Sequence, residues 1–233
     1  MDFNPPLTTA VLLQRYKRFL ADVKLADGST VTVHCPNTGS MLSCSAPGSL
    51  AAISISDNPH RKYPYTLEMV RDKTTWIGVN TARTNALVAE AIEEGRILEF
   101  QKVTSIKREV KVSAESRLDL LVSHNGRTTY VEIKNCSLAE NGCAMFPDAV
   151  TSRGTKHLQE LMNLAGAGQQ TCLFFLVQRM DADRFSPAGH IDPLYSRTLQ
   201  LAADKGVSIL AYQALVSPEG IEVARKLPCE LKC

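Results

Sequence analysis

The sequence lacks the features that would place it at once in a specialised class. Its 233 residues carry a formal net charge of only +2, and just 6% of them are aromatic. A charge this small rules out bulk basicity as the basis for nucleic-acid binding, so any such surface must come from local clusters of Arg and Lys. The apolar share of 44% is that of an ordinary globular protein, with enough core for one large domain or two modest ones.

The sequence also lacks Cys-x-x-Cys motifs, the pattern of a signal peptide and long apolar runs. The seven cysteines contain no Cys-x-x-Cys, which argues against a disulfide framework and against structural zinc. The start, Met1–Pro6, lacks the basic and apolar segments of a signal peptide. No apolar run approaches the roughly 20 residues of a membrane span. We therefore expect a cytoplasmic protein without a membrane partner.

The most informative pattern present is a hairpin that carries two acids. Residues 117–122 and 129–134 alternate in polarity as strands do, and Asn125-Gly126 between them is a strong signal for a two-residue turn. Such a turn fixes the register, because the numbers of paired residues must then sum to 251. Asp119 is thereby predicted to face Glu132, and the two side chains point the same way.

Opposed carboxylates about 5 Å apart repel by roughly 3 kcal/mol at an effective dielectric of 20, so a compensating charge is expected. A Mg²⁺ or Mn²⁺ ion fits, because hard cations take oxygen ligands and keep positions open for water and phosphate. Lys134 follows Glu132 on the same strand face, where it can orient a water molecule. The alternative is a surface network in which Arg117, opposite Lys134 in this register, neutralises the acids.

These residues also resemble known families. Arg117-Leu118-Asp119 with Glu132-Ile133-Lys134 is similar to the PD-(D/E)XK nuclease core, and this resemblance implies that Asp119, Glu132 and, as a third carboxylate, Glu109 hold the metal. Nearly the whole chain resembles the bacterial sugar fermentation stimulation protein A family, most clearly at Cys35–Met41, Lys107–Lys111, Phe146–Val150 and Arg153–His157. That resemblance implies DNA binding linked to the regulation of sugar, especially maltose, metabolism.

Two domains are predicted. Residues 1–82 are rich in short strands and turns, with residues 11–25 extended and Asp27-Gly28 as a hairpin turn, which predicts a small β-barrel. An OB-like barrel fits the strand count and the family, and from composition alone an SH3-like barrel fits equally well. Residues 83–95 have helical spacing, end at Gly95, and are expected to connect the domains.

Residues 96–233 are expected to form a PD-(D/E)XK, or restriction-endonuclease-like, mixed α/β domain. Strands are predicted near 108–112, 117–122 and 129–135. A helix near 154–166, a strand at 171–177, a second helix capped by Asp192-Pro193 and a strand at 207–212 follow. Asp148, in a loop before the first of these helices, is either a metal ligand or a turn residue.

Basic clusters supply the candidate DNA contacts. The residues concerned are Arg15, Lys17 and Arg18, beside Tyr16 and Phe19; Arg61 and Lys62; and Arg153, Lys156 and His157. A solvated basic face is the alternative for each cluster. Two functions stay open at this point: a DNA-binding regulator whose acidic site is silent, and an active Mg²⁺-dependent deoxyribonuclease. The oligomeric state, homodimer included, is left undecided by the sequence.

Overall fold

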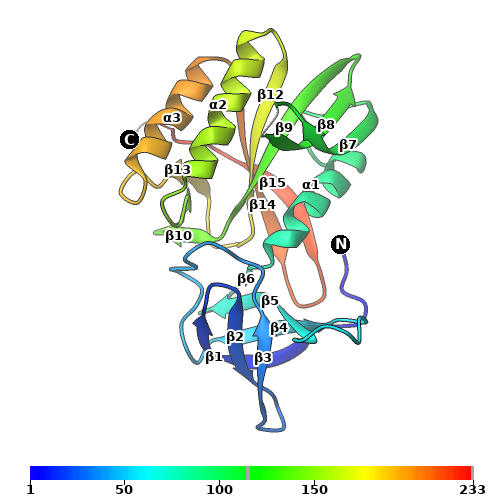
Figure 1. The fold of residues 1–233 in the computed structure, drawn as a ribbon, viewed down its shortest axis with the longest axis vertical. Coiled ribbons are helices and arrows are strands. Elements are labelled where there is room, and N and C mark those ends of the chain that lie inside the picture. Colours follow the sequence, from blue (N-terminus) through cyan, green and yellow to red (C-terminus); the bar gives the residue numbers. More distant parts are fainter. Residues whose placement is uncertain (114–115, 232–233) are drawn as a thin grey trace.

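The computed structural model describes residues 1–113 and 116–231, which form two β-rich units, one above the other in Figure 1. The first unit consists of β1 (Thr8–Tyr16), β2 (Leu20–Lys24), β3 (Thr30–His34), β4 (Leu50–Ile55), β5 (Tyr65–Asp72) and β6 (Thr75–Gly78). The strands lie in the order β3-β2-β1-β4-β5-β6, and a pairing of His34 with Thr66 joins β3 to β5. Strands β1 to β5 thus close into a five-stranded barrel, which confirms the OB-like prediction.

Two predictions for this barrel are corrected by the structure. Residues 11–25 are not one extended segment, because the chain reverses between β1 and β2 at Lys17–Phe19. Lys17 and Arg18 reach this turn with φ angles of 49° and 62°, and neither Gly nor Asn marks it in the sequence. Strand β5 was not predicted, because Glu68 interrupts its apolar pattern; Glu68 is buried and paired with Arg83 at 2.6 Å.

The second unit is built on a six-stranded mixed sheet. Its strands are β7 (Val103–Lys111), β8 (Arg117–His124), β9 (Arg127–Cys136), β12 (Gln170–Val177), β14 (Ser208–Val216) and β15 (Ile221–Leu227), in the order β15-β14-β12-β9-β8-β7. The central strands β9, β12 and β14 are parallel, and the hairpin partners on both sides are antiparallel. The predicted mixed α/β sheet is confirmed.

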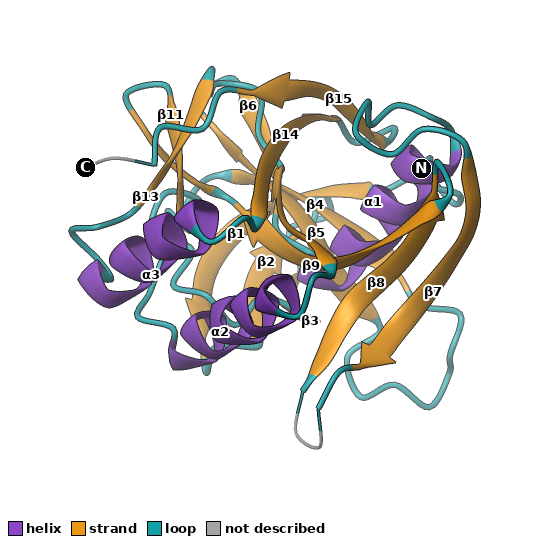
Figure 2. Ribbon diagram, turned by 90° about the horizontal axis from the view of Figure 1, so that it is seen from above, coloured by secondary structure: helices purple, strands orange, loops and turns teal. Residues whose placement is uncertain are grey.

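Helices cover both faces of this sheet (Figure 2). α1 (Thr84–Glu93), preceded by the short 3₁₀ turn η1 (Thr81–Arg83), packs on one face, and α2 (Ser152–Gly166) with α3 (Pro193–Asp204) packs on the other. Asp192 caps α3 as predicted, because its Oδ1 accepts a hydrogen bond from the Tyr195 N–H at 2.9 Å. The short strands β10 (Leu138–Glu140), β11 (Cys143–Phe146) and β13 (Arg184–Pro187) form a small extra sheet that no sequence pattern predicted.

The barrel and the mixed sheet are held together by buried polar contacts. Arg179, 2% exposed, donates from the second unit to the Ser43 hydroxyl of the barrel at 2.9 Å and to the Ser137 carbonyl at 2.8 Å. The Gly78 N–H of the barrel donates to the Gln178 carbonyl at 2.9 Å. These contacts place the loops of the barrel against one end of the sheet. None of the helices in the described parts of the chain is long and apolar enough to cross a membrane.

Candidate functional site

The hairpin of β8 and β9 has the register that the sequence predicts. Pairs run from His124 with Arg127 to Leu120 with Val131, around a turn in which Asn125 and Gly126 have φ angles of 48° and 73°. Both central residues therefore take the left-handed conformation of a type I′ turn, the reason Asn-Gly is favoured there. The same register continued by one step brings Asp119 level with Glu132.

The β8–β9 ladder ends at Leu120 and Val131, because beyond this pair the Asp119 side chain accepts a hydrogen bond from the backbone of β9. Its Oδ2 accepts from the Ile133 N–H at 2.7 Å, and its Oδ1 accepts from the Asn85 Nδ2 at 2.8 Å. Asn85 belongs to α1, which packs on the sheet and so brings this amide to Asp119. The sequence carried no signal for Asn85, since only the packing of α1 on the sheet brings it to Asp119.

Glu132 lies deeper than Asp119 and is 2% exposed. Its Oε1 lies 2.5 Å from the Lys134 Nζ and also contacts the His157 Nδ1 from α2. Its Oε2 is buried and has no hydrogen-bond partner among the described residues. The Lys134 Nζ and the His157 Nδ1 are themselves 3.2 Å apart. Strand and helix thus bring together an acid, an ammonium group and an imidazole.

Glu109 completes a row of carboxylates across three strands. Pairs of Arg108 with Leu120 and of Val110 with Leu118 flank it, so it lies level with Asp119 on the neighbouring strand β7. Its φ angle of 55° interrupts the regular ladder at this point. The exposed Glu109 side chain, the half-buried Asp119 and the buried Glu132 line one cleft of about 770 Å³.

Basic residues surround the acids in this cleft. Lys111, Arg117, Arg153 and Lys156 line it, together with Thr38 from the barrel. Within residues 1–113 and 116–231, the ion pairs of Glu132 go to Lys134 and His157, and Arg117 forms none with either acid. The alternative network, in which Arg117 neutralises the pair, is therefore not what the structure shows. The cleft offers a cationic rim around an acidic floor.

The two acids are driven to different pKa values. Burial, and then the charge of Glu132, raises the pKa of Asp119 to about 6. Burial alone would raise the pKa of Glu132 as well, but the hydrogen bond from His157 and the charge of Lys134 lower it below its ordinary value. Glu132 therefore keeps its negative charge, and Asp119 titrates near neutrality. Paired carboxyl groups separated in this way are typical of sites that handle protons or cations.

The residues fit a hard divalent cation on these grounds. Two carboxylates, one with an unpartnered buried oxygen and one with a raised pKa, are the donor set that Mg²⁺ or Mn²⁺ takes together with water. In the described residues no three His, Cys, Asp or Glu side chains already converge as a complete cage.

The raised pKa of Asp119 leads to a testable pH dependence in metal-free buffer. Between about pH 4 and pH 6 the folded protein holds a proton that the unfolded chain has lost, so the Asp119 contribution to the free energy of unfolding falls as pH rises. The Asp119→Asn side chain does not titrate, so its contribution to the free energy of unfolding does not fall as pH rises. Melting curves in EDTA should show the variant gaining on the wild type from pH 4 to pH 7, by at most about 3 kcal/mol. A difference that does not change with pH would contradict the raised pKa.

Two of the three predicted DNA-binding clusters lie in different parts of the structure. Arg153, Lys156 and His157 line the carboxylate cleft. Arg61 lies outside it and donates to the Thr66 hydroxyl at 3.0 Å, and Lys62 lies over the Tyr63 ring. The placement of Arg61 and Lys62 leaves their role in DNA binding a prediction.

Arg15 and Asp148 hold the barrel loop that borders the site. The Arg15 guanidinium donates to the carbonyls of Arg18, Asn37, Gly39 and Ser40 at 2.8 to 3.3 Å. Asp148 accepts from the Met41 N–H at 2.9 Å, and its carbonyl accepts from the Ser40 hydroxyl at 2.5 Å. Arg15 is thus engaged with the loop of residues 37–40, whereas Lys17 and Arg18 form no side-chain hydrogen bond or ion pair with other described residues. Asp148 joins this loop to the second unit.

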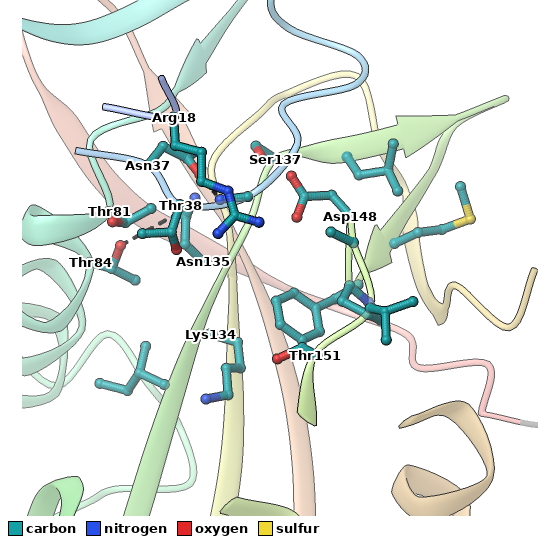
Figure 3. A pocket seen from close by; sticks show the side chains of 18 of the residues that line it. Arg18, Asn37, Thr38, Thr81, Thr84, Lys134, Asn135, Ser137, Asp148 and Thr151 are labelled. Carbon is teal, nitrogen blue, oxygen red and sulfur yellow. Dashed lines mark hydrogen bonds between the residues drawn. The ribbon is translucent and has the colours of Figure 1, made fainter. Parts of the chain in front are cut away.

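A second pocket, of about 370 Å³, lies between the barrel and the mixed sheet (Figure 3). It shares Thr38, Ile133 and Lys134 with the carboxylate cleft. Arg18 reaches into it from the barrel, opposite Asp148. Sequence reasoning did not find this pocket, because its walls come from segments far apart in the chain.

Comparison with known proteins agrees with this architecture. The family model described as the SfsA N-terminal OB domain matches residues 13–79, and the one described as the sugar fermentation stimulation protein RE domain matches residues 82–220. The "sugar fermentation stimulation protein homolog" of Desulfotalea psychrophila is 61% identical over 93% of this chain and 92% of its own. That of Pelobacter propionicus is 53% identical over 96% and 97%. The solved structure of Pyrococcus furiosus SfsA, in complex with Ca²⁺, is similar with a TM-score of 0.91 at 27% identity, over 99% of this chain and 98% of that one.

Proposed function

The chain belongs to the sugar fermentation stimulation protein family, and from this premise and the cleft geometry we propose that it binds DNA and hydrolyses phosphodiester bonds with Mg²⁺ or Mn²⁺. One observation carries the proposal. An acidic pair with separated pKa values and an unpartnered buried oxygen forms the floor of a cleft with a cationic rim. Phosphates fit the rim, and a divalent cation fits the floor.

Each residue of the floor has a part in this proposal. Asp119 and Glu132 would hold the cation, with Glu109 on the neighbouring strand as a third carboxylate. When bound, the cation neutralises the carboxylate pair and polarises a phosphoryl oxygen. Asn85 and the Ile133 N–H fix the orientation of the Asp119 carboxylate. The Ca²⁺ complex of the Pyrococcus furiosus relative supports a site for a hard cation.

Lys134 and His157 are placed to assist the attacking water. The Arg153 Nε–H donates to the His157 Nε2 at 3.5 Å, so Nε2 is the acceptor and the imidazole proton sits on Nδ1, facing Glu132. The Lys134 ammonium, held by Glu132 at 2.5 Å, then provides the positive charge beside a developing phosphorane-like transition state.

A second candidate is a DNA-binding regulator of sugar metabolism, including maltose metabolism, in which the cleft binds without cutting. The observation that favours it is the engagement of the Glu132 Oε1 by both Lys134 and His157. A carboxylate with one oxygen already in use has fewer lone pairs for a metal ligand role. Both candidates share DNA as the partner.

Cleavage assays separate these candidates. Purified protein is incubated with single-stranded, duplex, flapped and branched DNA, with EDTA, Mg²⁺ or Mn²⁺, and both retention and chain length are measured. The nuclease proposal expects cutting of at least one substrate only with metal, and loss of cutting in Lys134→Ala. Retention of DNA with no cut product in any metal would favour the regulator.

DNA binding itself is expected to be electrostatic and weakly selective for sequence. Affinity should fall with salt at a log-log slope of about −0.9 for each neutralised phosphate. The double variant Lys111→Ala/Arg117→Ala removes cations of the rim and should reduce the magnitude of this slope by about 2 in EDTA. Arg127→Ala, an exposed arginine outside the cleft, is the matched control. Affinity that does not change with salt would contradict the electrostatic mode.

A further inference from the structure

The second pocket adjoins the carboxylate cleft without belonging to it. The carboxylates Glu109, Asp119 and Glu132 line the cleft and not the pocket, whereas Lys134 lies in the wall that both share. Strand β9 runs along this wall, so Glu132 faces the cleft, and Asn135, three residues further on, faces the pocket. A ligand in the pocket is therefore the immediate neighbour of whatever lies over the acids.

Much of the pocket lining is polar and uncharged, which suits the ring system of a nucleotide. Hydroxyl groups come from Thr38 and Thr84, and an amide comes from Asn135. The Asn37 amide and the Thr81 hydroxyl also line the pocket but already donate to the carbonyls of Val79 and Pro36. The Asn135 Oδ1 is taken by the Gln178 Nε2 at 2.5 Å, and this leaves the Asn135 amide N–H groups as the donors available to a ligand. An accessible volume of about 370 Å³ is at the small end of ligand pockets and suits a single nucleotide-sized group.

The pocket also offers an aromatic surface. Phe146, half-buried, also lines the pocket. Its ring packs against those of Phe175 and Tyr195, at centroid distances of 5.5 and 5.2 Å. A ring held in place by two others is a rigid platform. Bases stack on such side chains whatever their identity, which suits a site that does not select a sequence.

Three charged side chains line this pocket: Arg18 from the barrel, Asp148 opposite it, and Lys134 in the wall shared with the cleft. The Arg18 guanidinium reaches into the pocket in Figure 3 and forms no hydrogen bond or ion pair with the described residues. The turn that carries it holds Lys17 and Arg18 at φ angles of 49° and 62°, where side chains other than Gly or Asn are uncommon. An unpaired guanidinium presented on such a backbone is suited to a phosphate.

One side of the pocket is closed by the contact between the two units. A Cβ atom added at Gly39 would lie 2.5 Å from the Asp148 carboxylate oxygens, so the barrel loop and the loop after β11 touch there. The hydrogen bonds of Asp148 to Ser40 and Met41 hold this contact. A polynucleotide that enters from the cleft past Lys134 meets this closed side, and a strand end fits there better than a continuing strand.

From these observations we propose that the pocket binds the terminal nucleotide of a DNA strand, with the adjacent phosphodiester over Asp119 and Glu132. The inference rests on the proposed function and adds its substrate class: the enzyme removes nucleotides from strand ends. In the step, the oxygen of a water molecule forms a bond to phosphorus. The P–O bond between this phosphate and the neighbouring nucleotide breaks, so the phosphate stays on the terminal nucleotide. The proton of the water passes to the departing ester oxygen, and a mononucleotide leaves.

Mononucleotide binding tests the pocket independently of catalysis. Deoxyadenosine 5′- and 3′-monophosphates are titrated into the full-length protein in EDTA by calorimetry, with inorganic phosphate as a separate arm. We expect saturable binding of a mononucleotide, a dissociation constant at least tenfold higher in Arg18→Ala, and no change in Arg127→Ala. Equal affinity for phosphate and mononucleotide would overturn the pocket, and so would binding unaffected by Arg18→Ala.

Circular DNA tests the requirement for an end. Linear and circular single strands of the same sequence are incubated with Mn²⁺, and the proposal expects mononucleotide release from the linear strand with the circle left intact. Cutting of both would overturn the terminal pocket and leave the proposed nuclease function standing. If neither is cut, the proposed hydrolysis fails, and the mononucleotide titration alone decides whether the pocket binds a nucleotide.

Discussion

Asp119→Asn is expected to abolish the metal-dependent stabilisation of the protein while leaving the metal-free protein as stable as the wild type, or more stable, at pH 7. The wild-type carboxylate is destabilised by burial and by Glu132, as its pKa of about 6 indicates, and the amide removes that charge. The Asn85 amide can rotate to keep a hydrogen bond with the new side chain. A cation at one hundred times its dissociation constant stabilises the wild type by about 2.7 kcal/mol, and the variant should lose this gain.

Melting curves with EDTA and with Mn²⁺ measure both effects, and cleavage should fall by at least about a hundredfold, or ~2.7 kcal/mol of transition-state stabilisation. Asp183→Asn, which changes a side chain that is 71% exposed, is the matched control and should keep the metal shift. If wild type shows no metal-induced shift and Asp119→Asn melts lower, the acids serve a structural network and the metal site is refuted.

Arg179→Met should destabilise the protein by roughly 3 kcal/mol, because two groups at the junction lose a charged hydrogen-bond donor at about 1.5 kcal/mol each. Arg179 is 2% exposed and binds Asp181 through two hydrogen bonds of 2.6 and 2.7 Å. Its remaining donors satisfy the Ser43 hydroxyl and the Ser137 carbonyl, which join the barrel to the second unit. Methionine fills part of the space but leaves these groups without their donor. Thermal and urea unfolding measure the change.

Arg184→Met is the matched control for this experiment. Arg184 has a side chain that is 35% exposed and pairs with Asp183, 71% exposed, so water replaces most of what the bridge provides. A loss below about 1 kcal/mol is expected. If the two variants lose equal free energy of unfolding, the buried contacts of Arg179 do not stabilise the junction of the two units.

The parts of the site that lie close together in the chain were predictable from sequence. Alternation and the Asn-Gly turn gave the register of the β8–β9 hairpin, because a two-residue turn permits a single pairing. Asp119 and Glu132 follow from that register, and Lys134 follows from the strand period of two. The helix that carries Arg153 and His157 was likewise predicted from apolar spacing, and both side chains line the cleft.

Other features escaped sequence reasoning for identifiable reasons. The turn at Lys17 and Arg18 uses left-handed backbone without Gly or Asn, and β5 carries a buried glutamate whose partner lies on another element. The Asp119 partner, Asn85, lies 34 residues away, and no local pattern reports a contact across that separation. Arg15 holds four carbonyls of its own barrel, a role that the sequence did not indicate, and its predicted contact with DNA stays a prediction.

The sequence by itself determined the pairing of the two acids and the order of strands and helices in the mixed sheet, since each depends on periodicity and turn chemistry within a short stretch of chain. The OB-like barrel was chosen through the family resemblance, because composition alone fits an SH3-like barrel equally well. Tertiary structure alone decided the electrostatics and the second pocket. Burial raises the pKa of both acids, and the two pKa values diverge because α2 brings His157 to Glu132, where it acts together with Lys134. The pocket exists because the barrel loop docks on Asp148, and burial and docking are properties of the packed molecule, which a local sequence pattern does not encode.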